Sequence, residues 1–199
     1  MSRILIAYAS SYGQTKQIAE ALSGSLRRRG HVVELADAFA GAPPPVEDYD
    51  AVVLGSHVQF GVHARPIVQY AAANRVALEE MPSFFFSVSM AAASTTASDP
   101  QGYLEKLLAA TEWRPRAAIA FAGGLPYRKY SWLMRWIMKL ISQRAGHSTD
   151  TSHDHDYTDW AQVERFAATI ATTIAAELAT RPLEPAPPPV ADSGAPHIR

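Results

Sequence analysis

The amino-terminal stretch Ile4-Leu5-Ile6-Ala7-Tyr8, followed by Ser10-Ser11-Tyr12-Gly13-Gln14-Thr15, decides the fold class. Its first five residues form an apolar run typical of a strand that is buried on both faces. After the hydroxyl-rich loop, Ile18, Leu22 and Leu26 recur at helical spacing. A helix that starts directly after such a loop presents backbone N–H groups and the positive end of its dipole. The stretch therefore predicts a strand, a phosphate-binding loop and a helix amino terminus.

The composition of this loop narrows the class of ligand. Residues 10–15 contain a single glycine, which does not match the G-x-G-x-x-G fingerprint of dinucleotide sites, and the chain has no G-x-x-x-x-G-K-[ST] loop. Hydroxyl and backbone N–H groups dominate, and Lys16 is the only nearby cation in the sequence. Such groups suit the terminal phosphate of a mononucleotide such as FMN better than NAD or ATP. The alternative is that Ser10 and Ser11 only cap a helix.

The overall composition excludes several classes of protein. The chain has 199 residues, 48% hydrophobic content, a net charge of −1 and no cysteine. It is long enough for a substantial core, has no global attraction for nucleic acid, and forms no disulfide or cysteine-ligated metal centre. Its amino-terminal apolar run ends by Ala9 without a small-residue cleavage site, and no apolar stretch reaches the ~20 residues of a membrane span. We expect a cytoplasmic protein that touches a membrane without crossing it.

Strand and helix patterns alternate along the chain. Further strands are expected at 31–36, 51–55, 83–89 and 117–122, and helices at 64–78, 100–110 and 159–178. The last helix begins with a capping box of Asp159 and Gln162. Parallel neighbours need right-handed crossovers whose helices cover both faces of the sheet. The order predicts an α/β fold, a doubly wound five-stranded parallel sheet, with ligands at the carboxyl ends of its strands.

The segments after the third, fourth and fifth strands suit a flat heterocycle. Phe60 can stack on a ring, and Gly61 allows the backbone to approach it closely. His57 is the candidate catalytic residue, as a proton acceptor, because imidazole titrates near neutral pH; the alternative is a solvated loop histidine. The other cofactor-binding candidates at these strand ends are Ser56, Phe86, Ser87, Val88, Ser89, Gly123, Gly124 and Tyr127.

Residues 125–146 are the most unusual segment, because they are basic and rich in tryptophan and contain no acidic residue. Residues 131–142 follow a helical pattern with a broad apolar arc and a narrow basic strip. Such a helix suits a membrane interface or a cover over an apolar substrate, and the alternative is a helix packed on the core. The candidates for substrate or membrane contact are Arg128, Lys129, Trp132, Arg135, Trp136 and Lys139.

The rest of the carboxyl-terminal part offers less chemistry. His153 and His155 alternate with aspartates in a polar loop, which is typical of a solvated segment, and no metal site is expected. We expect residues 1–180 to form one domain with a long helical insertion at 125–157. The proline-rich segment 181–199 is expected to be a disordered tail.

These pieces resemble the flavodoxin superfamily and, more closely, its quinone-dependent protoporphyrinogen IX dehydrogenase family. The likeness runs from Arg3 to about Ala175, and the insertion after the fifth strand separates this family from plain flavodoxins. The matching runs are Gly13-Gln14-Thr15, Tyr49-Asp50 with Val52-Val53-Leu54-Gly55-Ser56, Met81-Pro82-Ser83, Phe86-Ser87-Val88, Trp113-Arg114-Pro115, Tyr127-x-x-Tyr130-x-Trp132, Thr149-Asp150-Thr151 and Tyr157-Thr158-Asp159-Trp160.

The resemblance implies noncovalent FMN, with its phosphate on residues 10–15 and its ring near the loops beyond Phe86 and Gly123, including Asp150. It also implies oxidation of protoporphyrinogen IX in haem synthesis, transfer of electrons to a membrane quinone, and peripheral contact with the cytoplasmic face of the inner membrane through 125–146. A flavodoxin-type electron carrier and an FMN-dependent NAD(P)H:quinone oxidoreductase remain alternatives. A response-regulator receiver needs paired acids after the first strand, where Ala7-Tyr8-Ala9 has none.

Overall fold

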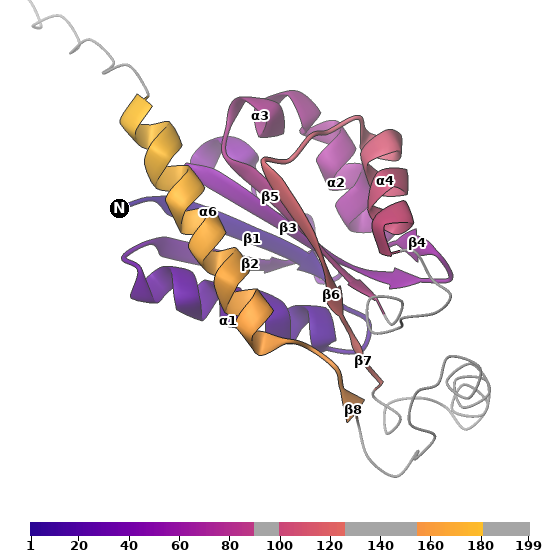
Figure 1. Ribbon diagram of the computed structural model, residues 1–199. Coiled ribbons are helices and arrows are strands. Elements are labelled where there is room, and N and C mark those ends of the chain that lie inside the picture. Colours follow the sequence, from indigo (N-terminus) through magenta and orange to yellow (C-terminus); the bar gives the residue numbers. More distant parts are fainter. Residues whose placement is uncertain (90–99, 126–154, 181–199) are drawn as a thin grey trace, which may run out of the picture.

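The computed structural model describes residues 1–89, 100–125 and 155–180. Its centre is a parallel sheet of five strands in the order β2-β1-β3-β5-β6 (Figure 1). The doubly wound sheet predicted from the sequence is therefore confirmed. The strands are β1 (Arg3–Ala9), β2 (Val32–Asp37), β3 (Ala51–Gln59), β5 (Ser83–Ser89) and β6 (Ala117–Ala122).

Helices cover both faces of the sheet (Figure 1). On one face α1 (Gln14–Arg28) lies beside α6 (Trp160–Thr180). On the other face lie α2 (Arg65–Ala73), α3 (Arg75–Glu80) and α4 (Pro100–Thr111). This division follows from right-handed crossovers between parallel strands, which place successive helices on opposite sides where the chain changes direction across the sheet.

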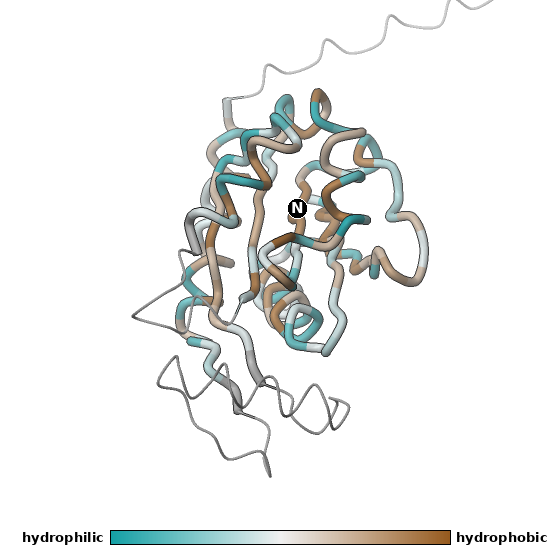
Figure 2. Tube along the Cα trace, turned by 90° about the vertical axis from the view of Figure 1, so that its right-hand side faces the viewer, coloured by the Kyte–Doolittle hydropathy of each residue, from teal (hydrophilic) through white to brown (hydrophobic). Residues whose placement is uncertain are grey.

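Alternation of side chains along the strands divides the core into two layers. In β1, Ile4 and Ile6 pack under α1 and α6, whereas Leu5 and Ala7 pack under α2 and α4. All four side chains are fully buried. The hydropathy colouring in Figure 2 shows apolar residues along the strands between the two helical layers. A strand covered on both faces reads as a continuous apolar run, which is the pattern that predicted it.

Gly55 is required by the packing of the sheet centre. A Cβ atom at this position would lie 2.1 Å from Cζ of Phe86, whose ring covers the glycine from the neighbouring strand. Real carbon atoms do not approach so closely, and an overpacked core forces neighbouring side chains to shift. The absence of a side chain at Gly55 thus makes room for a core phenylalanine.

Three elements differ from the sequence predictions. The helix expected at 64–78 is two helices, because the Asn74 side chain donates to the Tyr70 carbonyl oxygen (2.9 Å) and the backbone leaves the helical ladder there. The loop expected after residue 55 continues β3 to Gln59 and turns back as β4 (Val62–His63). A short 3-10 helix η1 (Val46–Asp48) lies in the connection between β2 and β3, for which the sequence patterns predicted no element.

Other expectations concern residues outside the described part of the chain. These are the helical insertion beyond residue 125, including its pattern at 131–142, and the proline-rich segment 181–199. The structure does describe the two strands that flank the insertion, β7 (Gly124–Leu125) and β8 (His155–Asp156), which pair antiparallel. The predicted helix cap at Asp159 is confirmed, because its Oδ1 accepts the Gln162 backbone N–H at 3.1 Å.

Candidate functional site

The phosphate loop predicted from the sequence lies at the carboxyl end of β1 and leads into α1. Gly13 adopts a left-handed conformation (φ 100°), which glycine accommodates without strain, and its N–H donates to Ser10 Oγ at 3.0 Å. Helix α1 starts without a side-chain cap and has no acidic residue in its first turn, while Arg27 and Arg28 occupy its last turn. The helix dipole and the charges therefore combine to favour an anion at this helix start.

His57 is hydrogen bonded to the phosphate loop from the neighbouring strand. Its Nδ1 lies 3.1 Å from the Ala9 carbonyl oxygen, and its Nε2 lies 3.1 Å from the Ser11 hydroxyl. A carbonyl oxygen only accepts hydrogen bonds, so Nδ1 carries a proton. In the neutral ring Nε2 is then an acceptor, and the Ser11 hydroxyl donates to it. The proposed proton acceptor is thus positioned against the phosphate end of the site.

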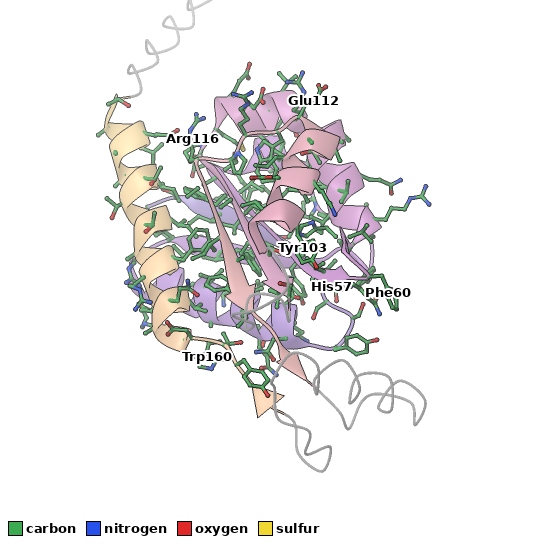
Figure 3. All side chains as sticks on the ribbon, turned by 45° about the vertical axis from the view of Figure 1, so that its right-hand side comes forward. His57, Phe60, Tyr103, Glu112, Arg116 and Trp160 are labelled. Atoms are coloured by element: carbon green, nitrogen blue, oxygen red, sulfur yellow. The ribbon has the colours of Figure 1, made fainter. Side chains whose placement is uncertain are left out.

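The β3–β4 hairpin projects at the same edge of the sheet. Its two turn residues both have positive φ, Phe60 at 51° and Gly61 at 80°, which is the geometry of a tight two-residue hairpin turn. The Phe60 ring is 87% exposed, and Figure 3 shows it beyond His57 at the tip of the hairpin. Gln59 Nε2 donates to the Tyr12 hydroxyl at 3.2 Å, which connects the hairpin to the phosphate loop. Phe60 is therefore an exposed aromatic residue at the tip of a hairpin that is bonded to the predicted phosphate loop.

His63 connects this hairpin to the end of β5. Its Nε2 lies 3.0 Å from Ser87 Oγ, and its ring contacts the Phe85 ring edge-on with centroids 5.3 Å apart. Burial, with a smaller contribution from the charge of His57, lowers the pKa of His63 to about 4. The side chain is therefore neutral at physiological pH and positions the hairpin without carrying charge.

The candidates on β5 differ in which side chains can reach a ligand. Ser87 and Ser89 are polar groups near the strand end, and the Gly123 N–H donates to the Ser89 carbonyl oxygen at 3.0 Å. The side chains of Phe86 and Val88 instead belong to the core under α1 and α6. Contact of these two residues with a ligand at the strand end would therefore be through the backbone.

Thr158 lies at the candidate site, although no sequence pattern indicated it as a site residue. Its hydroxyl accepts from Gln14 Nε2 at 2.7 Å and donates to the Ala122 carbonyl oxygen at 2.9 Å. These bonds join the phosphate loop to the end of β6 and to the chain just before α6. Gln14 is thereby positioned by a partner that follows it by 144 residues, which no local pattern could reveal.

The predicted site residues form two groups, those that the structure brings together and those that lie outside the described residues. The structure brings together Ser10, Ser11, Tyr12, Gly13, Gln14 and Thr15 with Ser56, His57, Phe60, Gly61, Ser87, Ser89, Gly123 and Gly124 at the carboxyl ends of β1, β3, β5 and β6. Ser56 Oγ accepts the Ala64 N–H at 2.9 Å and so stabilises the end of the hairpin. The other candidates, which lie outside the described residues, are Tyr127, Arg128, Lys129, Trp132, Arg135, Trp136, Lys139 and Asp150.

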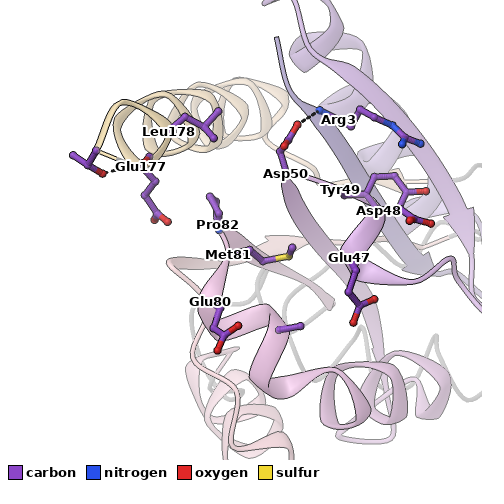
Figure 4. A pocket seen from close by; sticks show the side chains of 12 residues that line it. Arg3, Glu47, Asp48, Tyr49, Asp50, Glu80, Met81, Pro82, Glu177 and Leu178 are labelled. Carbon is purple, nitrogen blue, oxygen red and sulfur yellow. Dashed lines mark hydrogen bonds between the residues drawn. The ribbon is translucent and has the colours of Figure 1, made fainter. Parts of the chain in front are cut away.

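The opposite edge of the sheet holds a hollow of about 510 Å³ (Figure 4). Glu47, Asp48, Asp50, Glu80 and Glu177 contribute carboxylates to its lining, against one cation, Arg3. A phosphate monoester would be repelled there. The size of this hollow therefore does not make it the ligand site, since the charge and hydrogen-bond donors favour the carboxyl edge.

Two further properties concern the described residues as a whole. No group of three His, Cys, Asp or Glu side chains in 1–89, 100–125 and 155–180 is arranged to hold a metal ion. None of the described helices combines the length and apolar character needed to cross a bilayer.

Comparisons with known proteins agree with the fold. The family model described as Flavodoxin domain matches residues 5–152. Protoporphyrinogen IX dehydrogenase (quinone) of Escherichia coli strain K12 is 34% identical over 171 residues, which cover 85% of this chain and 94% of that protein. The Leishmania major protein of the same name is 30% identical over 172 residues, which cover 85% of this chain and 74% of that protein.

The solved structures support the same assignment at the level of the fold. Oxidised flavodoxin 1 from Bacillus cereus superposes with a TM-score of 0.53 at 14% identity, and the match covers 86% of this chain and 98% of that chain. A flavodoxin from the domain Archaea gives 0.51 at 14% identity, covering 87% of this chain and 99% of that chain. The chain therefore belongs to the flavodoxin domain family and is related along most of its length to proteins named protoporphyrinogen IX dehydrogenase (quinone).

Proposed function

We propose that this protein is an FMN-dependent dehydrogenase that oxidises protoporphyrinogen IX to protoporphyrin IX in haem synthesis and passes the electrons to a quinone. The observation that carries the proposal is 34% identity over 171 residues that cover 94% of the Escherichia coli enzyme. A match that covers 85% of this chain has to include the hairpin and the insertion, so it is not restricted to the part that all flavodoxins share.

The described residues fit FMN at the carboxyl edge. Residues 10–15 would hold the phosphate through hydroxyl and N–H groups, because α1 starts there with no acidic residue in its first turn. Phe60 and Gly61 would cover one side of the ring, and the backbone around Ser89 and Gly123 would approach its other parts. When bound, the flavin supplies the two-electron redox chemistry, while the protein supplies placement and electrostatics.

The substrate is an apolar macrocycle with two propionates, and the insertion offers groups that match it. Arg128, Lys129, Arg135 and Lys139 would pair with the carboxylates, while Trp132 and Trp136 would contact the ring or the surface of a membrane. Peripheral contact with the cytoplasmic face of the inner membrane would bring the site to a lipid-borne quinone. The six-electron oxidation is then completed in two-electron steps, with each pair of electrons and its protons leaving as a quinol.

Anaerobic mixing of FMN-loaded protein with protoporphyrinogen IX tests the proposal. The visible flavin absorbance should fall as porphyrin fluorescence rises, and adding a quinone should restore the absorbance. Unchanged absorbance in protein that quinone still reoxidises after chemical reduction would exclude the substrate. Steady turnover with NADPH and quinone instead would identify a quinone oxidoreductase, and exchange of electrons with redox proteins alone would identify a carrier.

Removing the basic, tryptophan-bearing segment tests the role of the insertion. A deletion of residues 131–143 should retain FMN binding, because the described contacts of the phosphate loop lie elsewhere. Dehydrogenase turnover and sedimentation with anionic lipid vesicles should both fall. Unchanged sedimentation would show that this segment does not contact the membrane.

A further inference from the structure

The Ser11 hydroxyl cannot donate to a neutral His57 and to a bound phosphate at once. It has a single proton, and with Nδ1 of a neutral ring protonated toward the Ala9 carbonyl oxygen, that proton would be directed to Nε2. A phosphate at the start of α1 would take that proton as a hydrogen-bond donor. Nε2 of His57 would then have no hydrogen-bond donor, and the phosphate anion would lie close to it, separated only by the Ser11 hydroxyl. In that position a protonated Nε2 is favoured over an unpaired lone pair.

Among the described residues, the cation that directly follows this loop does not supply an unshared positive charge. Lys16 follows the loop, but its Nζ lies 3.9 Å from a carboxylate oxygen of Glu20, and both side chains are about half exposed. Its charge is therefore screened by water and shared with an acid. His57 is held nearer to the loop by its bond from Nδ1 to the Ala9 carbonyl oxygen, which stays in place when Nε2 gains a proton.

The groups that face His57 are compatible with a positive charge on its imidazole ring. Phe39, from the segment after β2, places its ring centroid 5.9 Å from that of the imidazole, and the loop contributes the Ala9 carbonyl oxygen and the Ser11 hydroxyl. Asp37, the last residue of β2, provides the carboxylate next to Phe39, and its Oδ1 accepts the Phe39 N–H at 2.9 Å. His63, from β4, is the second imidazole, and burial keeps it neutral. A positive charge would therefore reside on His57 and not on His63.

We infer that His57 is a phosphate-recognition residue, which binds the cofactor phosphate as an imidazolium and makes the affinity for FMN, but not for riboflavin, depend on pH. This inference rests on the proposed function in that FMN is the ligand. It assigns His57 to phosphate binding in place of proton transfer from the substrate. It also predicts that binding transfers one proton from solvent to the protein when the pH lies above the range in which imidazole titrates.

Titration of the apoprotein with FMN and with riboflavin, followed by flavin fluorescence, tests the inference. Between about pH 8.5 and about pH 6.5, where imidazole gains its proton and the phosphate keeps most of its second charge, the Kd for FMN should fall about tenfold. The Kd for riboflavin should stay constant. In His57→Asn the amide can still donate to the Ala9 carbonyl oxygen but has no titrating nitrogen, so the FMN affinity should become independent of pH. His57→Gln provides the same comparison if the asparagine variant fails to fold.

His31 provides a matched control, because it lies just before β2 at the other edge of the sheet. His31→Gln should retain the full pH dependence of the wild type. Long-range nitrogen NMR gives a second readout, in which the FMN complex at neutral pH should show both ring nitrogens of His57 protonated. An FMN affinity independent of pH in the wild type overturns the inference alone, whereas absence of FMN binding at every pH overturns the proposed function together with it.

Discussion

The two edges of the central sheet are made of similar backbone but differ in the groups they expose. At the carboxyl edge, hydroxyls, two histidines and two positive-φ turns surround the start of α1. At the amino edge, the hollow in Figure 4 is lined by five carboxylates and is bordered by hydrogen bonds that connect the strands to the helices. Arg3 makes two such contacts at the amino edge. Its backbone N–H donates to Asp50 at 2.8 Å, and its guanidinium lies 5.2 Å from the centre of the Tyr49 ring.

The volume of a hollow alone therefore does not identify the ligand site. The amino edge offers a hollow of about 510 Å³ without a helix start of suitable charge, whereas the carboxyl edge offers donors and an exposed aromatic ring. In a parallel sheet the carboxyl ends of the strands lead into helix amino termini, so the favourable dipoles all gather at that edge. We therefore expect substitutions at the amino edge to change stability and those at the carboxyl edge to change flavin binding.

The largest expected effect is at the amino edge. Trp113 is fully buried, and its Nε1 donates to Ser83 Oγ, which in turn donates to the Leu78 carbonyl oxygen. Trp113→Ala should lower the free energy of unfolding by about 3–5 kcal/mol, because it leaves a large cavity and removes one of the two hydrogen bonds of the buried Ser83 hydroxyl. Urea denaturation measures the loss, with Trp113→Phe as a control that should lose less.

The same variant tests the separation of the two edges. The folded fraction of Trp113→Ala should bind FMN with the affinity of the wild type, since its indole lies at the other end of β5. An FMN affinity that decreases in proportion to the loss of stability would show that the two edges are not independent.

The second largest effect is a pH dependence of the free energy of unfolding, which is due to His63 at the carboxyl edge. The folded pKa of His63 is about 4, below the ordinary value of 6.5, so the unfolded chain binds more protons between these values. The stabilisation is present above pH 6.5 and is lost as the pH falls toward 4. The free energy of unfolding of the wild type should therefore fall by up to about 3 kcal/mol more than that of His63→Gln.

Denaturation curves at several pH values measure this difference, because other acids such as Asp159 and Glu164 lose their own stabilisation in both proteins alike. If the two proteins lose stability in parallel, His63 does not carry the pH dependence. The expected result would limit the comparison of the two edges, since it would show that a buried group of the carboxyl edge also contributes to stability.

A smaller effect, on binding, is expected at Ser10. Its Oγ accepts the Gly13 N–H at 3.0 Å and so closes the turn before α1. Ser10→Ala should raise the Kd for FMN about tenfold, which corresponds to one hydrogen bond in the site, and should change the free energy of unfolding by less than about 1 kcal/mol. Isothermal calorimetry with FMN gives the first quantity, and Ser25→Ala, on α1 but away from the loop, is the control. Equal affinities for FMN in Ser10→Ala and the wild type would argue against a phosphate at this loop.

The fold was more predictable than the site because core strands have local signatures. Ser83–Ser89 and Ala117–Ala122 have the predicted bounds. Ala117–Ala122 is a continuous apolar run that ends before Gly123, and Ser83–Ser89 follows Pro82 and is rich in phenylalanine. The β3–β4 hairpin was missed because its strand continues through Ser56, His57 and Gln59, which are polar, and its turn places phenylalanine at a positive φ where asparagine or glycine is usual.

For the candidate site, the sequence indicated the loop but not its partners. The composition of residues 10–15 predicted an anion site at the carboxyl end of β1, and the structure has a helix start without a side-chain cap there. Alternation along β5 could have separated Ser87 from Phe86 and Val88, whose side chains point to the core under α1. The bonds from Ser11 to His57 and from Gln14 to Thr158 span 46 and 144 residues, so they depend on the tertiary fold.

The smallest expected effects compare two exposed ion pairs, one at each edge. Arg116 donates to Glu177 at 2.8 Å beside the amino-edge hollow, and Lys16 lies 3.9 Å from Glu20 near the phosphate loop. Arg116→Ala should lower the free energy of unfolding by less than about 1 kcal/mol, with the loss decreasing at high salt, and should leave FMN affinity unchanged. Lys16→Ala should leave stability unchanged but raise the Kd for FMN about twofold at low salt, because it removes a cation near the phosphate. The opposite pattern in these two variants would mean that the acidic edge, and not the loop at the start of α1, is where the anion binds.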